Sequence, residues 1–149
     1  MHHRSIVAAT LGILLLTGSA SAQISAGNPN VMITPTNPAA PGTIKRINVT
    51  DAFKEVNAKK AVIVDVRSAE QFRLGHIKGA LNIPLSQLLS RVRELPFGKT
   101  VITYCACPAE ESSGRAVLTL ANHGIKNSAA MLGGYNSWKK QNLPIERSK

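Results

Sequence analysis

The sequence is poor in cysteine, aromatic residues and acidic residues, and each shortage excludes a class of protein. Two cysteines in 149 residues are too few for a disulfide-stabilised scaffold. Aromatic residues make up only 4% of the chain and are not interleaved with the basic residues, which argues against a nucleic-acid-binding surface. The 18 lysines and arginines outnumber the 8 aspartates and glutamates, so the formal net charge is +10. We therefore expect small anions, and no nucleic acid, as partners.

The chain also lacks an apolar run long enough to span a bilayer comfortably, although a shorter run lies near its start. Residues 6–16 are mostly apolar and follow a short basic segment at 1–4. They precede Ala20-Ser21-Ala22, small residues of the kind that a signal peptidase requires. We expect a signal peptide over residues 1–22, cleaved before Gln23, with an uncleaved anchor as the alternative. The mature protein is then exported, into the periplasm, without stable membrane insertion.

Two further regions follow this predicted signal. Residues 23–42 are rich in Asn, Pro, Ala, Ser and Thr and show no helical or strand period, which predicts a disordered tether. Residues 43–149 are long enough to form one domain with a hydrophobic core. In this region predicted strands and helices alternate, which favours an α/β fold with a parallel sheet and helices on both faces.

Hydrophobic spacing and capping residues define the predicted elements of the domain. Apolar and β-branched runs predict strands at 44–49, 61–66, 80–83, 100–104 and 129–132. Helical spacing predicts helices at 51–57 after Thr50, at 69–74 after a Ser68–Gln71 capping box, at 85–95, from Ser112 or Ser113 to Ala121, and at 135–141. We expect Trp138 in the core, and Gly133 and Gly134 in a turn that needs unusual backbone angles.

The two cysteines lie in the segment Tyr104-Cys105-Ala106-Cys107-Pro108, directly after the predicted strand at 100–104. Open α/β sheets bind ligands at the carboxyl ends of their strands, and a following helix N-terminus stabilises an anion such as a thiolate. A cysteine at this place is a candidate nucleophile. A disulfide between the two would close a very small ring and stabilise the fold little, so a structural role explains the pair poorly.

Several short motifs occur in an order that matches a known family. They are Val62-Ile63-Val64-Asp65-Val66-Arg67, Gly75-His76-Ile77, Asn82-Ile83-Pro84, Tyr104-Cys105, Leu132-Gly133-Gly134-Tyr135 and Trp138. The chain resembles a rhodanese-like domain, which implies a three-layer α/β fold whose central parallel sheet of about five strands is flanked by helices. The resemblance also implies a sulfurtransferase without cofactor or metal. Its cysteine takes a sulfane sulfur from an anionic donor such as thiosulfate, holds it as a persulfide, and passes it to cyanide or a thiol.

The same resemblance assigns roles to individual residues. Alignment from the strand makes Cys105 the nucleophile, whereas alignment back from the following helix gives that place to Cys107. The loop that would bind the sulfur contains Ala106, Cys107, Pro108, Ala109, Glu110, Glu111 and Ser112. Arg67 is either a substrate contact or part of a structural ion pair, and Asp65 and His76 are expected to be structural residues near the site.

The loop departs from the usual pattern of the family, and this departure leaves other functions open. Inward-pointing Glu110 and Glu111 would raise the pKa of a thiolate and repel thiosulfate, whereas in the first turn of the helix they would point to solvent. Cys107 could also resolve a persulfide or mixed disulfide on Cys105, which would make the protein a thiol–disulfide redox protein. A weak soft-metal site on the two thiolates and a non-catalytic binding module are further alternatives.

Overall fold

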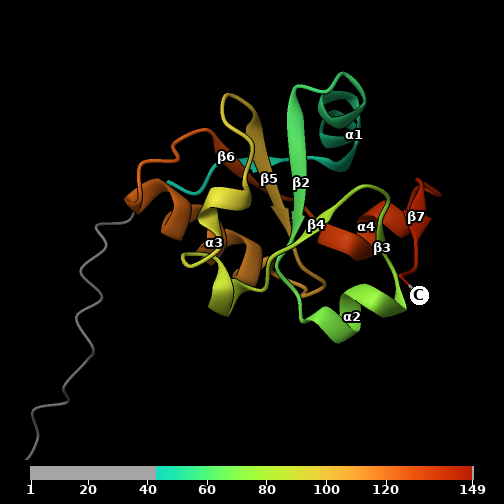
Figure 1. The fold of residues 1–149 in the computed structure, drawn as a ribbon. Coiled ribbons are helices and arrows are strands. Elements are labelled where there is room, and N and C mark those ends of the chain that lie inside the picture. Colours follow the sequence, from blue (N-terminus) through green and yellow to red (C-terminus); the bar gives the residue numbers. More distant parts are fainter. Residues whose placement is uncertain (1–42, 149) are drawn as a thin grey trace, which may run out of the picture. The chain divides into compact units, whose positions relative to one another are not determined.

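The computed structural model describes residues 43–148, in which strands and helices alternate (Figure 1). The elements are β1 (Arg46–Ile47), α1 (Val49–Asn57), β2 (Ala61–Asp65), α2 (Ala69–Leu74), β3 (His76–Ile77), β4 (Leu81–Asn82), η1 (Leu85–Gln87), η2 (Val92–Glu94), β5 (Thr100–Tyr104), α3 (Glu111–Asn122), β6 (Ser128–Met131), α4 (Gly134–Lys140) and β7 (Ile145–Glu146). The predicted signal peptide (1–22) and tether (23–42) lie outside the described residues. Within residues 43–148, no helix has the length and apolarity to cross a membrane.

Five strands form one parallel sheet in the order β1-β6-β5-β2-β4. The central strands β2 and β5 pair along their whole length, from Ala61 opposite Thr100 to Asp65 opposite Tyr104. Both are rich in β-branched residues and almost wholly buried, as expected for strands covered on both faces. Because the strands are parallel, the carboxyl ends of β2 and β5 meet at one edge of the sheet. The segments that follow Asp65 and Tyr104 therefore lie next to each other.

Helices cover both faces of this sheet, which confirms the predicted layers (Figure 1). On one face, α1 and α4 pack with the sheet in a buried cluster that includes Ile63, Ile102 and Trp138. On the other face, α3 and the two 3-10 turns pack in a second cluster that includes Leu88 and Leu120. The short helix α2 lies beyond the carboxyl ends of the strands, so it borders the site rather than the core.

The predicted helix at 85–95 is wrong, because the structure has two short 3-10 turns there. Its apolar residues are still used for packing, since Leu88 and Leu95 are buried against the sheet. Between the turns, the backbone of Arg91 leaves the helical region (φ −111°, ψ 12°). The guanidinium of Arg91 donates to the carbonyl oxygen of Asn82 at 3.1 Å, which ties this segment to the end of β4.

Two predicted helix starts are also wrong. The first helix begins after Asn48, whose Oδ1 accepts from the Asp51 amide at 2.8 Å while its Nδ2 donates to the Asp51 carboxylate at 2.8 Å. Thr50 therefore lies inside the first turn. The helix after the cysteines begins at Glu111, with Glu110 rather than either serine at the capping position. The Ser68 cap is confirmed, because its Oγ accepts from the Gln71 amide at 3.2 Å.

The remaining described strands form a small antiparallel pair, β3 with β7, which the sequence analysis did not predict. It aligns His76 with Glu146 and Ile77 with Ile145. Two-residue strands give no period-2 pattern long enough to be recognised. The pair brings the C-terminal segment next to the end of α2, where it contributes to the surroundings of the site.

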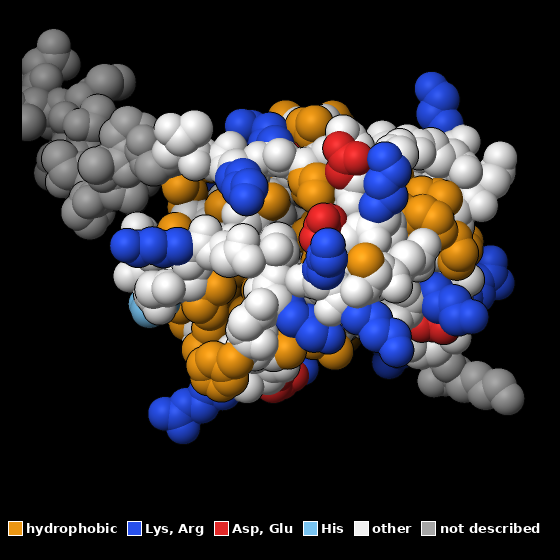
Figure 2. All heavy atoms as spheres, turned by 90° about the horizontal axis from the view of Figure 1, so that it is seen from above, with side chains coloured by type: hydrophobic (Ala, Val, Ile, Leu, Met, Phe, Trp, Pro, Cys, Tyr) orange, Lys and Arg blue, Asp and Glu red, His pale blue; other side chains and the backbone are white. Residues whose placement is uncertain are grey.

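The surface opposite the strand carboxyl ends carries scattered charge. Strands β2 and β5 run downward in Figure 1, so the view from above in Figure 2 shows the side of their amino ends. Lysine and arginine side chains are distributed there among hydrophobic and a few acidic ones. A hollow of about 560 Å³, lined by residues such as Phe97 and Ile125, contains no cysteine.

The capping assignment predicts which substitution destabilises the first helix. Asn48→Ala removes the reciprocal contacts with Asp51 and should lower the free energy of unfolding by about 1 kcal/mol. Thr50→Ala, the matched control two residues further on in the first turn, should change it by less than about 0.5 kcal/mol. Urea unfolding of both variants measures the difference. A larger loss for Thr50→Ala would return the cap to the position that the sequence suggested.

Candidate active site

A cavity of about 420 Å³ opens where the carboxyl ends of β2 and β5 meet. Its lining comes from the segment after β2, from α2, from the loop after β5 and from the first turn of α3: Val66, Arg67, Ser68, Gln71, Cys105, Ala106, Cys107 and Ser112. This is the edge of the sheet at which open α/β folds bind ligands. The structure thus brings Arg67 and the two cysteines to one cavity, as the motif order suggested.

Within this cavity, Cys105 and Cys107 form a disulfide, with their Cα atoms 5.7 Å apart. Cys105 is only 2% exposed, whereas Cys107 is half-buried and nearer to solvent. The Cys107 amide donates to the Sγ of Cys105 at 3.4 Å. An incoming thiol therefore reaches the sulfur of Cys107 more easily than that of Cys105.

Ser113 is a neighbour of the sulfur that the sequence analysis considered only as a helix cap. Its Oγ lies 3.8 Å from the Sγ of Cys105 and donates to the carbonyl of Glu110 at 3.0 Å. The serine is fully buried in the first turn of α3. Its place in the first turn of the helix that follows the cysteine loop is the signal that could have identified it.

The backbone of Cys105 is held by the N-terminus of α4. The Tyr135 amide donates to the carbonyl of Cys105 at 2.8 Å, and Asn136 Nδ2 donates to the carbonyl of Ala106 at 3.3 Å. This close approach depends on Gly134, which has a positive φ of +50°. A Cβ at Gly134 would collide with the carbonyl oxygen of Cys105. The predicted Gly133-Gly134 turn therefore serves to position the cysteine loop.

Glu110 closes the loop by a contact that local sequence patterns do not show. Its carboxylate accepts from the Gly133 amide at 2.8 Å, and its own amide donates to the carbonyl of Cys107 at 3.3 Å. Its backbone is left-handed, with φ 49°. Within residues 43–148, the cavity lining includes neither Glu110 nor the exposed residues Pro108, Ala109 and Glu111. Of the predicted sulfur-binding loop, Ala106, Cys107 and Ser112 line the cavity.

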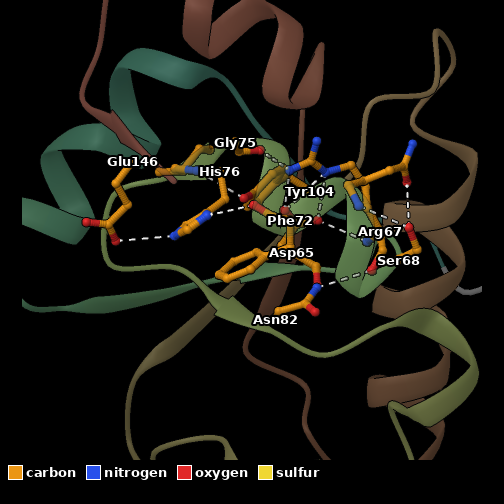
Figure 3. Close-up of polar contacts among 11 residues, drawn as sticks. Asp65, Arg67, Ser68, Phe72, Gly75, His76, Asn82, Tyr104 and Glu146 are labelled. Carbon is orange, nitrogen blue, oxygen red and sulfur yellow. Dashed lines mark hydrogen bonds and ion pairs between the residues drawn. The ribbon is translucent and has the colours of Figure 1, made fainter. Parts of the chain in front are cut away.

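Asp65 and Arg67 form a buried ion pair on the cavity wall (Figure 3). The Arg67 Nε lies 2.9 Å from Asp65 Oδ1, and Nη2 lies 2.5 Å from Oδ2 and 2.8 Å from the carbonyl of Gly75. The exposed fractions of the two side chains are 7% for Arg67 and 0% for Asp65. Burial lowers the pKa of Arg67, but the hydrogen bonds and charge of Asp65 outweigh it and raise the pKa above its ordinary value. The contacts are those of a structural ion pair whose cation also faces the cavity.

Tyrosine rings surround this ion pair. The guanidinium carbon of Arg67 lies 4.3 Å from the ring centroid of Tyr135 and 5.6 Å from that of Tyr104. The Tyr104 hydroxyl accepts from the Ile77 amide at 3.1 Å. Burial, together with the negative charge of Asp65, raises the pKa of Tyr104, so this hydroxyl stays protonated. The rings of Tyr104 and Tyr135 therefore hold the guanidinium of Arg67 in place, and Tyr104 is itself hydrogen-bonded to the backbone of Ile77.

His76 lies behind this wall and does not line the cavity (Figure 3). Its ring stacks on Phe72, its Nδ1 lies 2.9 Å from the carbonyl of Phe72, and its Nε2 lies 3.3 Å from the carboxylate of Glu146. The hydrogen bond from the Gly79 amide lowers the pKa of Glu146, and His76 lowers it further by a smaller amount. These contacts join β3 to α2 and β7.

Comparison with known proteins settles the family. Residues 48–141 match the family model of the rhodanese-like domain. The chain belongs to this family. A rhodanese-related protein from Thermoplasma volcanium superposes with a TM-score of 0.62 at 28% identity, over 70% of this chain and 99% of that one. The rhodanese-like fold expected from the motifs is thereby confirmed.

Named relatives of this rhodanese-like domain include sulfurtransferases. The thiosulfate sulfurtransferase GlpE of Vibrio cholerae is 30% identical over 102 residues, which cover 68% of this chain and 94% of the relative. Protein YqhL of Bacillus subtilis, described as uncharacterised, is 42% identical over 96 residues, covering 63% of this chain and 75% of the relative. A thiosulfate sulfurtransferase from Pseudomonas aeruginosa has a TM-score of 0.64 at 26% identity, over 71% of this chain and 21% of that one.

The close approach at Gly134 predicts a large effect of one methyl group. Gly134→Ala should lower the free energy of unfolding by about 3 kcal/mol, because backbone atoms of Cys105 must move and φ is strained. Gly124→Ala is the matched control. Gly124 also has a positive φ (+86°), but an added Cβ there would have no neighbouring atom within 4 Å. Its cost should be only about 1 kcal/mol. Equal losses in urea unfolding would show that the contact with Cys105 does not matter.

The ion pair predicts a strong non-additivity. Asp65→Asn leaves the buried cation of Arg67 uncompensated and should cost about 3 kcal/mol or more of stability. Adding Arg67→Gln removes that charge, so the double variant should lose less than the sum of the two single variants. Urea unfolding of the four proteins gives the coupling energy. Additive losses would mean that the two side chains contribute independently.

Proposed function

We propose that this rhodanese-like domain is a sulfurtransferase that carries a sulfane sulfur on Cys105. The observation that carries the proposal is the position of this sulfur in the cavity at the carboxyl end of β5, with the Cys107 amide directed at it. The 12-residue helix α3 begins at the same loop, and its N-terminal dipole favours the thiolate. Thiosulfate sulfurtransferases among the relatives support the same chemistry.

The reaction begins from the reduced protein, after a thiol reductant has opened the disulfide. The thiolate of Cys105 attacks the sulfane sulfur of thiosulfate, a new S–S bond forms, and sulfite leaves with the electron pair of the broken bond. Cys105 then carries a terminal persulfide anion. Attack by cyanide or by an acceptor thiolate on the outer sulfur forms thiocyanate or a new persulfide. The Cys105 thiolate departs as the leaving group, which restores the enzyme.

Fixed dipoles of the protein, rather than a free cation, stabilise the anions of this reaction. Arg67 faces the cavity, but Asp65 compensates its charge. Glu110 is held at the Gly133 turn, which keeps its carboxylate from entering the loop. What remains beside the sulfur is the backbone N–H of Cys107 and the N-terminus of α3, and both kinds of group commonly bind anions. The positive net charge of the chain favours the approach of an anionic donor.

Export into the periplasm is part of the proposal. It is supported by the basic start, the apolar run at 6–16 and the small residues Ala20-Ser21-Ala22. Such a compartment is oxidising, which suits a protein whose two cysteines can close a disulfide. The mature chain is then expected to begin at Gln23, which intact-mass measurement of the periplasmic fraction would test.

The disulfide favours one second candidate, a thiol–disulfide redox function. An external thiolate would attack the more accessible Sγ of Cys107, and Cys105 would leave as a thiolate stabilised by α3. The same pair also offers a branch of the sulfurtransferase reaction. Cys107 can attack the Sγ of a Cys105 persulfide, which releases hydrosulfide and closes the disulfide. The two electrons for sulfide formation then come from the two thiols.

Sulfur loading separates the two cysteines. The reduced protein is treated with thiosulfate and its intact mass is measured. Wild type and Cys107→Ser should gain one sulfur atom, whereas Cys105→Ser should gain none. Cys107→Ser should also keep its sulfur longer and release less hydrosulfide, because the resolving thiol is missing.

The other outcomes are equally informative. Loading of Cys105→Ser but not of Cys107→Ser would transfer the nucleophile to Cys107. No loading of any form, together with rapid turnover of dithiol substrates, would replace the sulfurtransferase by the redox protein.

A further inference from the structure

A second cavity of about 440 Å³ adjoins the one that holds the cysteines. The two share Arg67, Gln71 and Ala106 in their linings. The two cavities thus form one groove, which starts at the disulfide and runs past Arg67 toward α4 and the end of β7. Cavities of this size hold small organic molecules, and thiosulfate or cyanide would fill only a fraction of the outer one.

The outer cavity carries two cations besides Arg67, whose own charge is compensated by Asp65. Lys139 of α4 and Arg147, directly after β7, both line it, and its lining in residues 43–148 includes no acidic side chain. Within that part of the chain, neither cation forms an ion pair. The nearest acid in sequence, Glu146, accepts from the Gly79 amide and faces His76. The outer cavity therefore has a net positive charge.

Besides the polar Gln71 and Asn136, the outer wall includes exposed apolar side chains. Leu74 is 71% exposed and Ile145 is 47% exposed, and both line the cavity. The ring of Tyr135 contacts two cations of the wall, since Lys139 Nζ is 4.9 Å and the Arg67 guanidinium carbon 4.3 Å from its centroid. A ligand that fits this wall bears anionic groups and a short aliphatic part.

We propose that the outer cavity is an acceptor subsite for a small thiol that bears carboxylates. The inference rests on the proposed sulfurtransferase function and specifies its acceptor. Carboxylates at Lys139 and Arg147 hold the ligand, its aliphatic part lies on Leu74 and Tyr135, and its sulfur points past Arg67 to the cysteine loop. The acceptor thiolate attacks the outer sulfur of the Cys105 persulfide, Cys105 leaves as thiolate, and the acceptor departs as a persulfide. Anchoring at the far end raises the effective concentration of the thiol at the persulfide.

The test compares acceptors that differ in charge. Persulfide-loaded protein is discharged with mercaptosuccinate, with 2-mercaptoethanol or with cyanide, and second-order rate constants are measured. Lys139→Gln/Arg147→Gln should lower the rate constant for mercaptosuccinate about tenfold, equivalent to about 1.4 kcal/mol, and change the other two less than about twofold. Lys140→Gln is the control for the Lys139 part of the double variant, since it removes one positive charge from the same helix at a residue outside the cavity lining.

A binding measurement keeps this inference separate from the proposed function. Succinate, which has no thiol, should shift the backbone amide NMR signals of residues 135–139 in the wild type but not in the double variant. Persulfide formation with an unchanged mercaptosuccinate rate in the double variant would overturn the subsite and leave the sulfurtransferase intact. Failure of the wild type to form any persulfide would overturn the sulfurtransferase, and succinate binding would then decide whether the anion site exists.

Discussion

The buried ion pair between Asp65 and Arg67 is the constraint on which the rest of the site depends. It lies where β2 ends, and Arg67 also donates to the carbonyl of Gly75, so it connects the sheet to the end of α2. The rings of Tyr104 and Tyr135 pack against its cation. Breaking a buried pair by removing one partner is costly, because the remaining charge has no compensation. The wall shared by the two cavities is rigid for this reason.

This pairing also determines where positive charge is available to a ligand. Arg67 lines the cavity that holds Cys105, but its charge is compensated by Asp65. The sequence left open whether the Glu110 carboxylate points into the loop. In the structure this carboxylate accepts from the Gly133 amide. Near Cys105 the field therefore comes from the Cys107 amide and α3, whereas the uncompensated cations Lys139 and Arg147 lie further out along the groove. A short-range dipole field suits the thiolate, and the distant cations suit a larger anion.

The sequence predicted those features that arise from local patterns. The β-branched run ending at Tyr104 and the Ser68 cap each depend on neighbours in the chain, and both occur in the structure. The contact of Glu110 with Gly133 joins residues 23 apart in the chain, so no local pattern could show it. Local patterns also failed in the segment 85–95. Leu88 and Leu95 have helical spacing and are buried against the sheet, but the backbone forms two 3-10 turns. There, tertiary contacts overrode the helix that the spacing of the apolar residues predicted.

The disulfide and the proposed sulfurtransferase chemistry depend on the same geometry. Cys105 is the buried partner beside α3, which makes its thiolate the better leaving group, and Cys107 is the accessible partner that an external thiol reaches. In the proposed reaction, the oxidised form protects Cys105 but blocks sulfur transfer, since no free thiolate remains. In an oxidising compartment this would make transfer depend on a supply of reducing thiols. The acceptor that removes the sulfur and the reductant that opens the disulfide would then approach the loop through the same groove, and a carboxylate-bearing thiol has the chemistry for both steps.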